Sequence, residues 1–181
     1  FLVMEIQKPQ NLLHQGLFDE WEKNRSNAKK LAESIFEEKG LHSASMDQMA
    51  GKAHQNIFEV IDCMSCANCC KTTPPIILPA DIKKIGSFLK ISPNQFRMKF
   101  TLTDVDGEMS FKKVPCVFLG ENNLCQIYEV RPAACREYPH TDAPGFRHKK
   151  KLHLANAGIC PAVYHIIKNI LKEISPSIDP A

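Results

Sequence analysis

Apolar residues recur at helical spacing in the first third of the chain. One run lies between residues 12 and 38, and its apolar positions are Phe18, Trp21, Ala28, Leu31 and Ile35. A second run extends from Ser45 to about Ile61, with apolar positions Met46, Met49, Ala53, Ile57 and Val60. Because each run puts its apolar side chains on one face, we expect two amphipathic helices that pack as a hairpin, with Gly40 ending the first.

Two shorter helices are predicted in the middle of the chain. The first runs from about Pro79 to Lys90, and its inward positions are Ile82, Ile85 and Leu89. The second starts at Ser92-Pro93-Asn94-Gln95, where serine caps the helix, proline fits its first position and glutamine reaches back to the cap. It directs Phe96 and Phe100 toward the core. Such a pair is also typical of a helix-turn-helix, but its second helix offers a DNA groove only Arg97 and Lys99.

Alternating apolar and polar residues predict two small β-hairpins after these helices. Residues 101–113 alternate around Asp106-Gly107, a dipeptide typical of tight hairpin turns. A second short hairpin is predicted from Val117 to Tyr128, with its turn at residues 120–123. Antiparallel pairing across that turn brings Cys116 and Cys125 to one edge, which is the arrangement of a ligand pair.

The last part of the chain predicts a short helix, a loop and a longer helix. Pro132 and Pro139 bound the short helix, because proline fits a first helical position and ends a helix that reaches it. Residues 140–153 are loop-like and include a basic run at 147–151, which we interpret as solvated. The final helix begins at Pro161, and its apolar stripe is Val163, Ile166, Ile167, Ile170, Leu171 and Ile174.

Eight cysteines carry the candidate chemistry of this chain. Four lie within eight residues as C-x2-C-x2-C-C, and they are Cys63, Cys66, Cys69 and Cys70; the others are Cys116, Cys125, Cys135 and Cys160. A chain of 181 residues is long enough to form a hydrophobic core, so it does not need disulfides to hold a small fold together. Closely spaced cysteines in a reducing compartment are more often metal ligands. We therefore predict that all eight ligate metal.

Composition narrows the compartment and the partners. No segment reaches the ~18 apolar residues of a membrane span, and Phe1–Met4 is too short for the core of a signal peptide. We therefore expect a cytoplasmic protein with no membrane partner; the alternative is a secreted disulfide framework whose signal was removed. The formal net charge of +3 turns slightly negative if eight thiolates hold two divalent ions, so we do not expect nucleic acid as a partner.

The cysteine spacing also bears on which metal is bound. Zinc and iron both accept four thiolates in a tetrahedron, and a C-x2-C turn presents two sulfurs to one ion. The run C-x2-C-x2-C is typical of three ligands of a [4Fe–4S] cluster, and Cys160-Pro161 is typical of ferredoxin-like ligation. These two features favour an iron–sulfur cluster, with Zn2+ as the alternative. Side chains of adjacent residues diverge, so we expect Cys69 and Cys70 to serve different ions.

The order of these motifs resembles the CxxCxxCC (YkgJ-like) cysteine-cluster family. The resemblance is carried by the C-x2-C-x2-C-C run, then Cys125-Gln126-Ile127-Tyr128-Glu129-Val130-Arg131-Pro132, then Cys135-Arg136-Glu137-Tyr138-Pro139, then Cys160-Pro161. It covers residues 63–161 and implies a zinc- or iron-chelating domain, without implying a particular reaction.

These observations together predict a mainly helical α+β fold, in which small β-hairpins and helices surround a cysteine-ligated metal core. We expect an N-terminal helical hairpin at residues 1–61, a metal-binding domain at residues 62–175 and a frayed tail at residues 176–181. The C-terminal helix is expected to cover the metal.

Several polar residues near the cysteines have predicted roles beside the metal. Arg131 and Arg136 flank Cys135, where cationic donors would offset thiolate charge and lower cysteine pKa values; the alternative is an ordinary Arg pair on a helix surface. Tyr128 and Tyr138 would shield the site or donate hydrogen bonds to sulfur. The alternative ligands or proton carriers are His140, His148 and His153, and a supporting hydrogen bond is predicted for His165.

Three classes of function follow from a thiolate metal centre. The first is a metal-binding protein with a redox or structural role. The second is a zinc-stabilised module that binds a protein partner through its N-terminal helices. The third is an enzyme or enzyme subunit, in which an exposed cysteine or an open metal position reacts, since catalytic zinc keeps a position for water or substrate.

Overall fold

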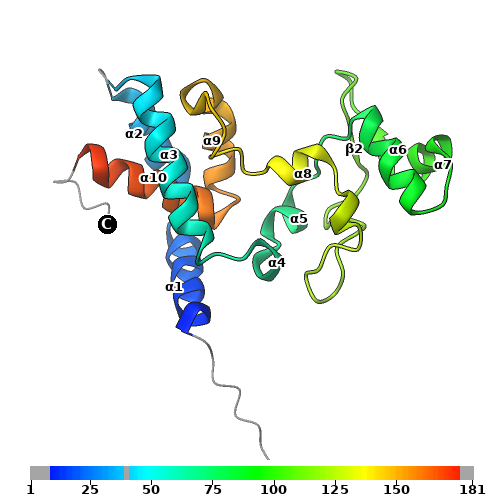
Figure 1. Cartoon of the computed structure of the whole chain (residues 1–181), viewed down its shortest axis with the longest axis horizontal. Helices are drawn as coiled ribbons and strands as arrows, with labels where there is room; N and C mark the ends of the chain where they lie inside the picture. The colour runs from blue at the N-terminus through cyan, green and yellow to red at the C-terminus, as the bar shows by residue number, and fades with distance from the viewer. Residues whose placement is uncertain (1–8, 39–40, 176–181) are drawn as a thin grey trace, which may run out of the picture. The chain divides into compact units, whose positions relative to one another are not determined.

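The computed structural model describes residues 9–38 and 41–175 (Figure 1). In this part of the chain most residues are helical, and the strands form one two-stranded antiparallel sheet. The predicted mainly helical α+β class is confirmed. The helix end predicted at Gly40 and the tail predicted at residues 176–181 lie outside the described residues.

Two compact units divide the chain. Unit 1 comprises residues 1–62 and 139–181, and unit 2 comprises residues 63–138. The sequence prediction grouped residues 139–175 with the cysteine-rich domain, whereas by their contacts these residues belong to unit 1. The division into an N-terminal domain and a metal-binding domain stays a prediction, and each unit is described by itself.

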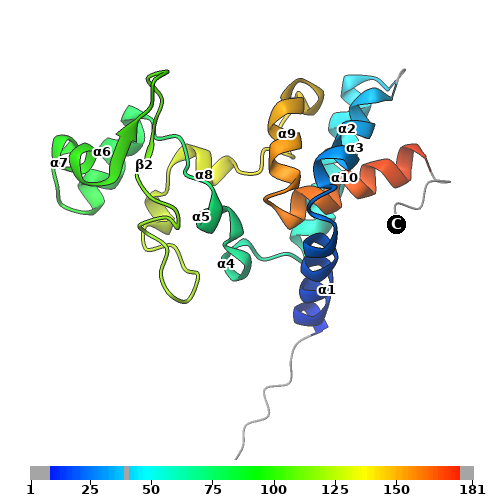
Figure 2. The same cartoon turned by 180° about the vertical axis from the view of Figure 1, so that it is seen from behind.

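Helix α10 (Pro161–Ile174) is the centre of unit 1. It contacts the other long helices of the unit (Figure 2), which are α1 (Pro9–Asn24), α2 (Ala28–Glu37), α3 (Ser43–Phe58) and α9 (Lys150–Ala157). Its predicted stripe is confirmed, since Val163, Ile166 and Ile167 are fully buried. Burying one side chain of this size contributes roughly 1.5–3 kcal/mol, so α10 supplies much of the core. No helix in the described ranges is long and apolar enough to cross a bilayer.

The single helix predicted at residues 12–38 is two helices, so this prediction was wrong. Residues 25–27 form a turn between α1 and α2. Asn24 directs its side-chain amide to the Glu20 carbonyl oxygen at 2.9 Å, and the Asn27 N–H donates to the Asn24 carbonyl oxygen at 2.9 Å. Asn and Ser side chains compete for the backbone hydrogen bonds of a helix, which explains why the chain turns here. The next helix, α3, begins two residues before the predicted Ser45.

Residues 140–153 were predicted to be a loop, and this prediction was wrong for the second half of the segment. Residues Phe146–Lys149 form a 3-10 helix, η2, which continues into α9. The Asp47 carboxylate accepts hydrogen bonds from the backbone N–H groups of Gly145 at 2.9 Å and Phe146 at 2.8 Å. This long-range anchor starts the helical segment, and the basic run lies within it.

Polar contacts fasten α1 to the C-terminal helices of unit 1. The Trp21 indole N–H donates to the Ala157 carbonyl oxygen at 3.0 Å, and the whole side chain is buried. His165 Nε2 donates to the Leu17 carbonyl oxygen at 2.8 Å, and Lys168 forms an ion pair with Glu20. His165 Nε2 is thus bonded to α1, and the hydrogen bond predicted from His165 to the metal site stays a prediction.

His153 lies in an aromatic stack inside unit 1 and is fully buried. Its ring stacks on Phe146 with 3.9 Å between ring centroids, and Phe36 is the third ring of the stack. Neither ring nitrogen has a hydrogen-bond partner of good geometry. Burial, helped by the charges of Lys149 and His140, lowers the pKa of His153 from 6.5 to about 4, although the backbone of Phe146 opposes the shift.

Replacing His153 by phenylalanine is expected to make unit 1 more resistant to acid. The unfolded chain takes up a proton near pH 6.5 and the folded chain only near pH 4, so the wild type loses about 3 kcal/mol of stability between these values. His54 and His165 also have pKa values lowered by burial, so the substitution reduces this loss without abolishing it.

The fluorescence of Trp21, the one tryptophan of the chain, reports unfolding of unit 1 and measures this effect. Denaturation curves at pH 7 and pH ~4.5 are compared for His153→Phe and for His148→Gln, which changes an exposed histidine of the same segment. Equal acid sensitivity in the two variants would contradict the prediction.

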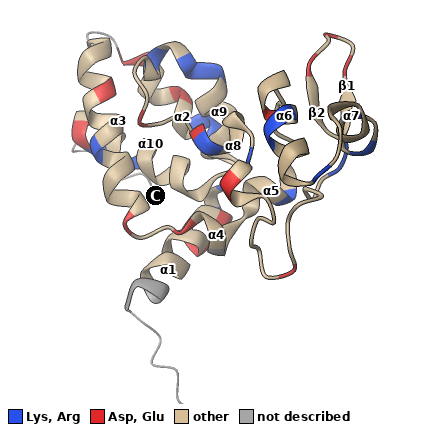
Figure 3. Ribbon diagram, turned by 45° about the vertical axis from the view of Figure 1, so that its right-hand side comes forward, with Lys and Arg blue, Asp and Glu red and all other residues tan. Residues whose placement is uncertain are grey.

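Unit 2 contains two helices and a hairpin that match the sequence prediction. Helix α6 (Pro79–Phe88) and helix α7 (Pro93–Phe100) are confirmed, and Ser92 and Gln95 form the predicted capping box with bonds of 2.8 and 3.2 Å. Strands β1 (Thr101–Thr103) and β2 (Met109–Phe111) pair with Leu102 opposite Ser110. The turn between them uses Gly107 at φ +84° and carries acidic residues at its tip (Figure 3).

The core of unit 2 is built around phenylalanine rings. Phe96 and Phe100 of α7, Phe111 of β2 and Phe118 form a closed set of ring contacts with centroid distances of 5.0 to 6.4 Å. Tilted and edge-on pairs of this kind add about 0.5–1.5 kcal/mol each beyond area burial. The thiols of Cys116 and Cys125 pack against this apolar cluster, so the cysteines are fixed by the core of the unit.

Candidate metal centre

The motif C-x2-C-x2-C-C forms two short helical turns. Helix α4 (Cys63–Cys66) carries the first two cysteines, and α5 (Asn68–Thr72) carries Cys69 and Cys70. Ala67 separates the turns with a left-handed backbone at φ 48°, a conformation that costs a non-glycine residue about 1–2 kcal/mol. The Ala67 N–H donates to the Cys63 carbonyl oxygen at 2.8 Å and so closes the first turn.

The sequence predicts that the adjacent side chains of Cys69 and Cys70 diverge. Instead, their thiols share a hydrogen bond. This hydrogen bond is the largest cause that raises the pKa of Cys70, followed by burial, while the charges of Lys71 and Arg131 oppose the shift. The directions of the two side chains therefore do not require Cys69 and Cys70 to bind different ions.

Cys116 and Cys125 lie beside Cys70, although they are far from it in sequence. The Cys116 N–H donates to the Cys70 carbonyl oxygen at 2.8 Å. The predicted second hairpin is reduced to a tight loop, in which Leu119 bridges to Cys125 and the Gln126 N–H donates to the Phe118 carbonyl oxygen at 2.9 Å. The expectation that this loop brings Cys116 and Cys125 together is met, because each thiol feels the charge of Cys70 and Cys116 feels that of Cys125.

Backbone amides donate to the sulfurs of Cys116 and Cys125. The N–H group of Phe118 donates to the Cys116 sulfur, and the N–H group of Ile127 donates to the Cys125 sulfur. The Leu119 N–H donates to the Cys116 carbonyl oxygen at 2.9 Å. Burial is the larger effect and raises the pKa of both thiols, whereas the hydrogen bonds to sulfur lower it because they stabilise the thiolate. The same local geometry thus occurs twice, with an amide donor two residues after each cysteine.

Cys135 completes the group from helix α8 (Ala133–Glu137). Burial raises the pKa of Cys135 to about 12, and the negative charges of the three other thiolates add to the shift. These electrostatic contacts link Cys70, Cys116, Cys125 and Cys135, which come from separate segments and are called the four-thiol group below. Cys69 adjoins this group through its hydrogen bond and its charge effect on Cys70.

Asp81 holds the segment that carries Cys135 against α6. Its buried carboxylate accepts hydrogen bonds from the N–H of Leu78 and from the N–H of Ala133, both at 3.0 Å. The first bond caps α6, and the second reaches 52 residues along the chain to the start of α8. The sequence analysis missed this role; an aspartate three positions into a helix that begins with Pro79 was the available signal.

Arg131 is a cation whose charge acts on three of the four thiols. Its guanidinium carbon lies 3.6 Å from the ring centroid of Tyr128, a residue of the 3-10 helix η1 (Tyr128–Val130). The charge of Arg131 lowers the pKa values of Cys70, Cys125 and Cys135 against the larger effects that raise them. Its Nε is buried and has no hydrogen-bond partner.

A family model matches residues 62–161 of this chain, and its description is "CxxCxxCC: Putative zinc- or iron-chelating domain". The match covers more than half of the 181 residues and includes all eight cysteines. The chain belongs to the CxxCxxCC family. No curated protein and no solved structure matches the chain. The CxxCxxCC description agrees with metal chelation by the cysteines and names zinc and iron without choosing between them.

The CxxCxxCC region includes residues of both units, and its eighth cysteine belongs to unit 1. Cys160 lies in unit 1 as the residue before α10, where it is buried, so its role as a ligand stays a prediction. All seven histidines also lie in unit 1, including the alternative ligands His140, His148 and His153. The metal ligands that unit 2 offers are therefore thiolates and carboxylates.

Thiolates of the CxxCxxCC region are ligand types that zinc and iron accept. Among the described residues, however, their sulfur atoms are not arranged around a common point. Across the described ranges, no three or more His, Cys, Asp or Glu side chains are arranged to hold an ion as they stand. Zinc binds thiolate sulfur at ~2.3 Å, so the thiols must approach one another further. The amide donors to sulfur and the unpartnered Nε of Arg131 suit the thiolate state, which a cation would stabilise.

Proposed function

We propose that this chain is a cytoplasmic metal-binding protein in which the four-thiol group of unit 2 holds a zinc or iron ion with a structural or redox role. The observation that carries this proposal is that four cysteines from separate segments lie within electrostatic reach of one another, in a unit that contains no histidine. Four thiolates satisfy the tetrahedral preference of a closed structural site. Such a bound ion would supply positive charge where burial and mutual repulsion disfavour thiolates.

The composition of the four-thiol group bears on the choice between zinc and an iron–sulfur cluster. A ferredoxin-like cluster takes three ligands from a C-x2-C-x2-C run. The four-thiol group instead takes one cysteine from the run, Cys70, and three from distant segments, which supports a single ion bound by four thiolates. The other cysteines stay predicted metal ligands, and they are Cys63, Cys66 and Cys69 of unit 2 and Cys160 of unit 1.

A purely structural ion would fit a protein-interaction module, and exposed apolar side chains favour unit 2 as its surface. Among the described residues of unit 1, the exposed large apolar side chains are Leu13 and Leu152. In unit 2 they are more numerous, and they include Phe88, Met98 and Val105. The N-terminal helices, predicted as the partner-binding surface, thus expose little apolar area. An enzyme would need an open metal position or a reactive thiol, for which exposed Cys63 is the candidate.

Elemental analysis with anaerobic spectroscopy tests the proposal. We expect protein purified without oxygen to contain about one equivalent of zinc or iron per four-thiol group, because thiolate sites of this kind are closed. Brown protein with absorption near ~400 nm that dithionite bleaches would indicate an iron–sulfur cluster, whereas colourless protein with stoichiometric zinc would indicate a structural ion. Protein that is metal-free as isolated and takes up neither metal on reconstitution would refute the proposal.

A further inference from the structure

We propose that Arg131 balances the charge of the metal-bound four-thiol group by donating a hydrogen bond from its Nε–H to one of the thiolates. This inference rests on the proposed function, because it assumes that the four-thiol group binds a metal ion. From the sequence, Arg131 and Arg136 were predicted to have the same role beside Cys135. The present inference gives only Arg131 a role at the metal centre.

Tyr128 fixes the position of the Arg131 guanidinium. The 3.6 Å separation of the guanidinium carbon from the ring centroid is typical of a stacked cation–π contact, which contributes about 0.5–2 kcal/mol. Both residues belong to the segment that joins Cys125 to Cys135, and the charge of Arg131 acts on both of these thiols. A planar side chain held in this way has little freedom left to lose when it donates a hydrogen bond.

The Nε–H of Arg131 is a buried donor with no acceptor in the protein. Buried polar groups of folded proteins are almost always hydrogen-bonded, because leaving one unpaired is costly. The charge of Arg131 acts on the thiols of Cys70, Cys125 and Cys135, so these sulfurs are the candidate acceptors. A thiol is a weak acceptor, whereas a thiolate is a strong one, so formation of the metal-bound state gives this donor its partner.

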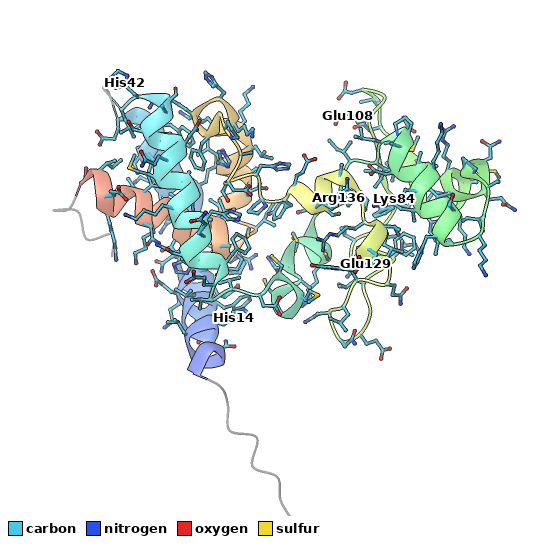
Figure 4. All side chains as sticks on the ribbon, viewed as in Figure 1. His14, His42, Lys84, Glu108, Glu129 and Arg136 are labelled. Atoms are coloured by element: carbon cyan, nitrogen blue, oxygen red, sulfur yellow. The ribbon has the colours of Figure 1, made fainter. Side chains whose placement is uncertain are left out.

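Charge balance points to the same residue. Four thiolates around a divalent ion retain net negative charge in a partly buried position, and a single guanidinium nearby halves it. Arg136 does not fill this role. It is exposed on α8 (Figure 4), and its Nη1 donates to the Arg131 carbonyl oxygen at 2.6 Å. The two arginines therefore form a matched pair for an experiment.

The experiment measures Co2+ and Zn2+ affinity of the full chain by competition with a chelator, under reducing and anaerobic conditions. We expect Arg131→Gln to weaken binding of both ions about 10- to 100-fold, the usual effect of removing a group that supports metal ligands, and Arg136→Gln to change it less than about 3-fold. Arg131→Lys restores the charge without the stacked Nε–H and should lie between. Tyr128→Leu should reproduce part of the loss, while Tyr128→Phe, which keeps the ring, should not.

The thiolate-to-cobalt charge-transfer band gives a readout that a merely structural role would not move. A hydrogen bond to sulfur lowers the energy of its lone pair, so this band should shift to longer wavelength in Arg131→Gln and not in Arg136→Gln. Equal affinities and equal band positions in the two variants would overturn the inference. If Arg131→Gln does not fold, Arg131→Lys and Tyr128→Leu decide by the same two measurements. Failure of the wild type to bind either ion would instead reject the proposed function.

Discussion

Replacing Cys135 by alanine is expected to remove about one metal ion per chain and to melt unit 2 more than ~10 °C below the wild type. Cys135 is the half-buried member of the four-thiol group on α8, and burial together with the charges of the other thiolates raises its pKa to about 12. Metal affinity at a thiolate site is largely folding free energy, so losing one of four ligands is costly for the whole unit. Elemental analysis and hydrogen exchange of α6 and α7 measure the two effects.

Two further substitutions make this prediction specific. Met64→Ala changes an exposed residue inside the cysteine motif and should leave both metal content and exchange unchanged. Cys160→Ala tests whether unit 1 supplies a ligand, since a fall in metal content would place Cys160 in a site. The prediction fails if Cys135→Ala binds as much metal as Met64→Ala and exchanges at the same rate.

Replacing Asp81 by alanine is expected to destabilise unit 2 by roughly 3–5 kcal/mol, because it removes two hydrogen bonds to a charged acceptor, each contributing about 1.5–3 kcal/mol. One bond caps α6 and the other fixes the start of α8, two residues before Cys135. Metal affinity should fall as well, since the backbone that positions this thiol loses its anchor. Chemical denaturation followed by hydrogen exchange in unit 2 gives the free energy.

The control for Asp81→Ala is Glu129→Ala, which removes an exposed carboxylate of the same unit (Figure 4). This change should alter stability by less than about 0.5 kcal/mol. Asp81→Asn keeps one acceptor oxygen and should fall between the two. If Asp81→Ala unfolds at the same denaturant concentration as Glu129→Ala, the anchoring role of Asp81 is incorrect.

Elements whose signals are local could be predicted from the sequence. The capping box at Ser92 and Gln95 and the Asp106-Gly107 turn are settled by neighbouring residues, and both formed as expected. Elements decided by distant contacts could not. The helix at Lys150–Ala157 depends on the anchoring of Phe146 by Asp47, which no window of local sequence contains.

The candidate site divides in the same way. Cysteine content and spacing predict thiolate metal binding, but they cannot tell which thiols converge, because that depends on the packing of the phenylalanine core. Cys70 meets Cys116 through a backbone hydrogen bond between segments far apart in the chain. Spacing alone suggested that Cys69 and Cys70 point apart, whereas their thiols share a hydrogen bond.

The nesting of one unit within the other has a consequence for synthesis on the ribosome. Unit 2 is a continuous stretch that ends at Tyr138, whereas unit 1 needs residues from both sides of it. Every contact within unit 2 is available to the nascent chain before α9 and α10 have been translated. Helices α1, α2 and α3 must meanwhile wait for α10, the helix that all three contact. Unit 2 is thus the first unit that can fold during translation. Unit 1 contains the residues that are translated first, but it can fold only after unit 2 has left the ribosome.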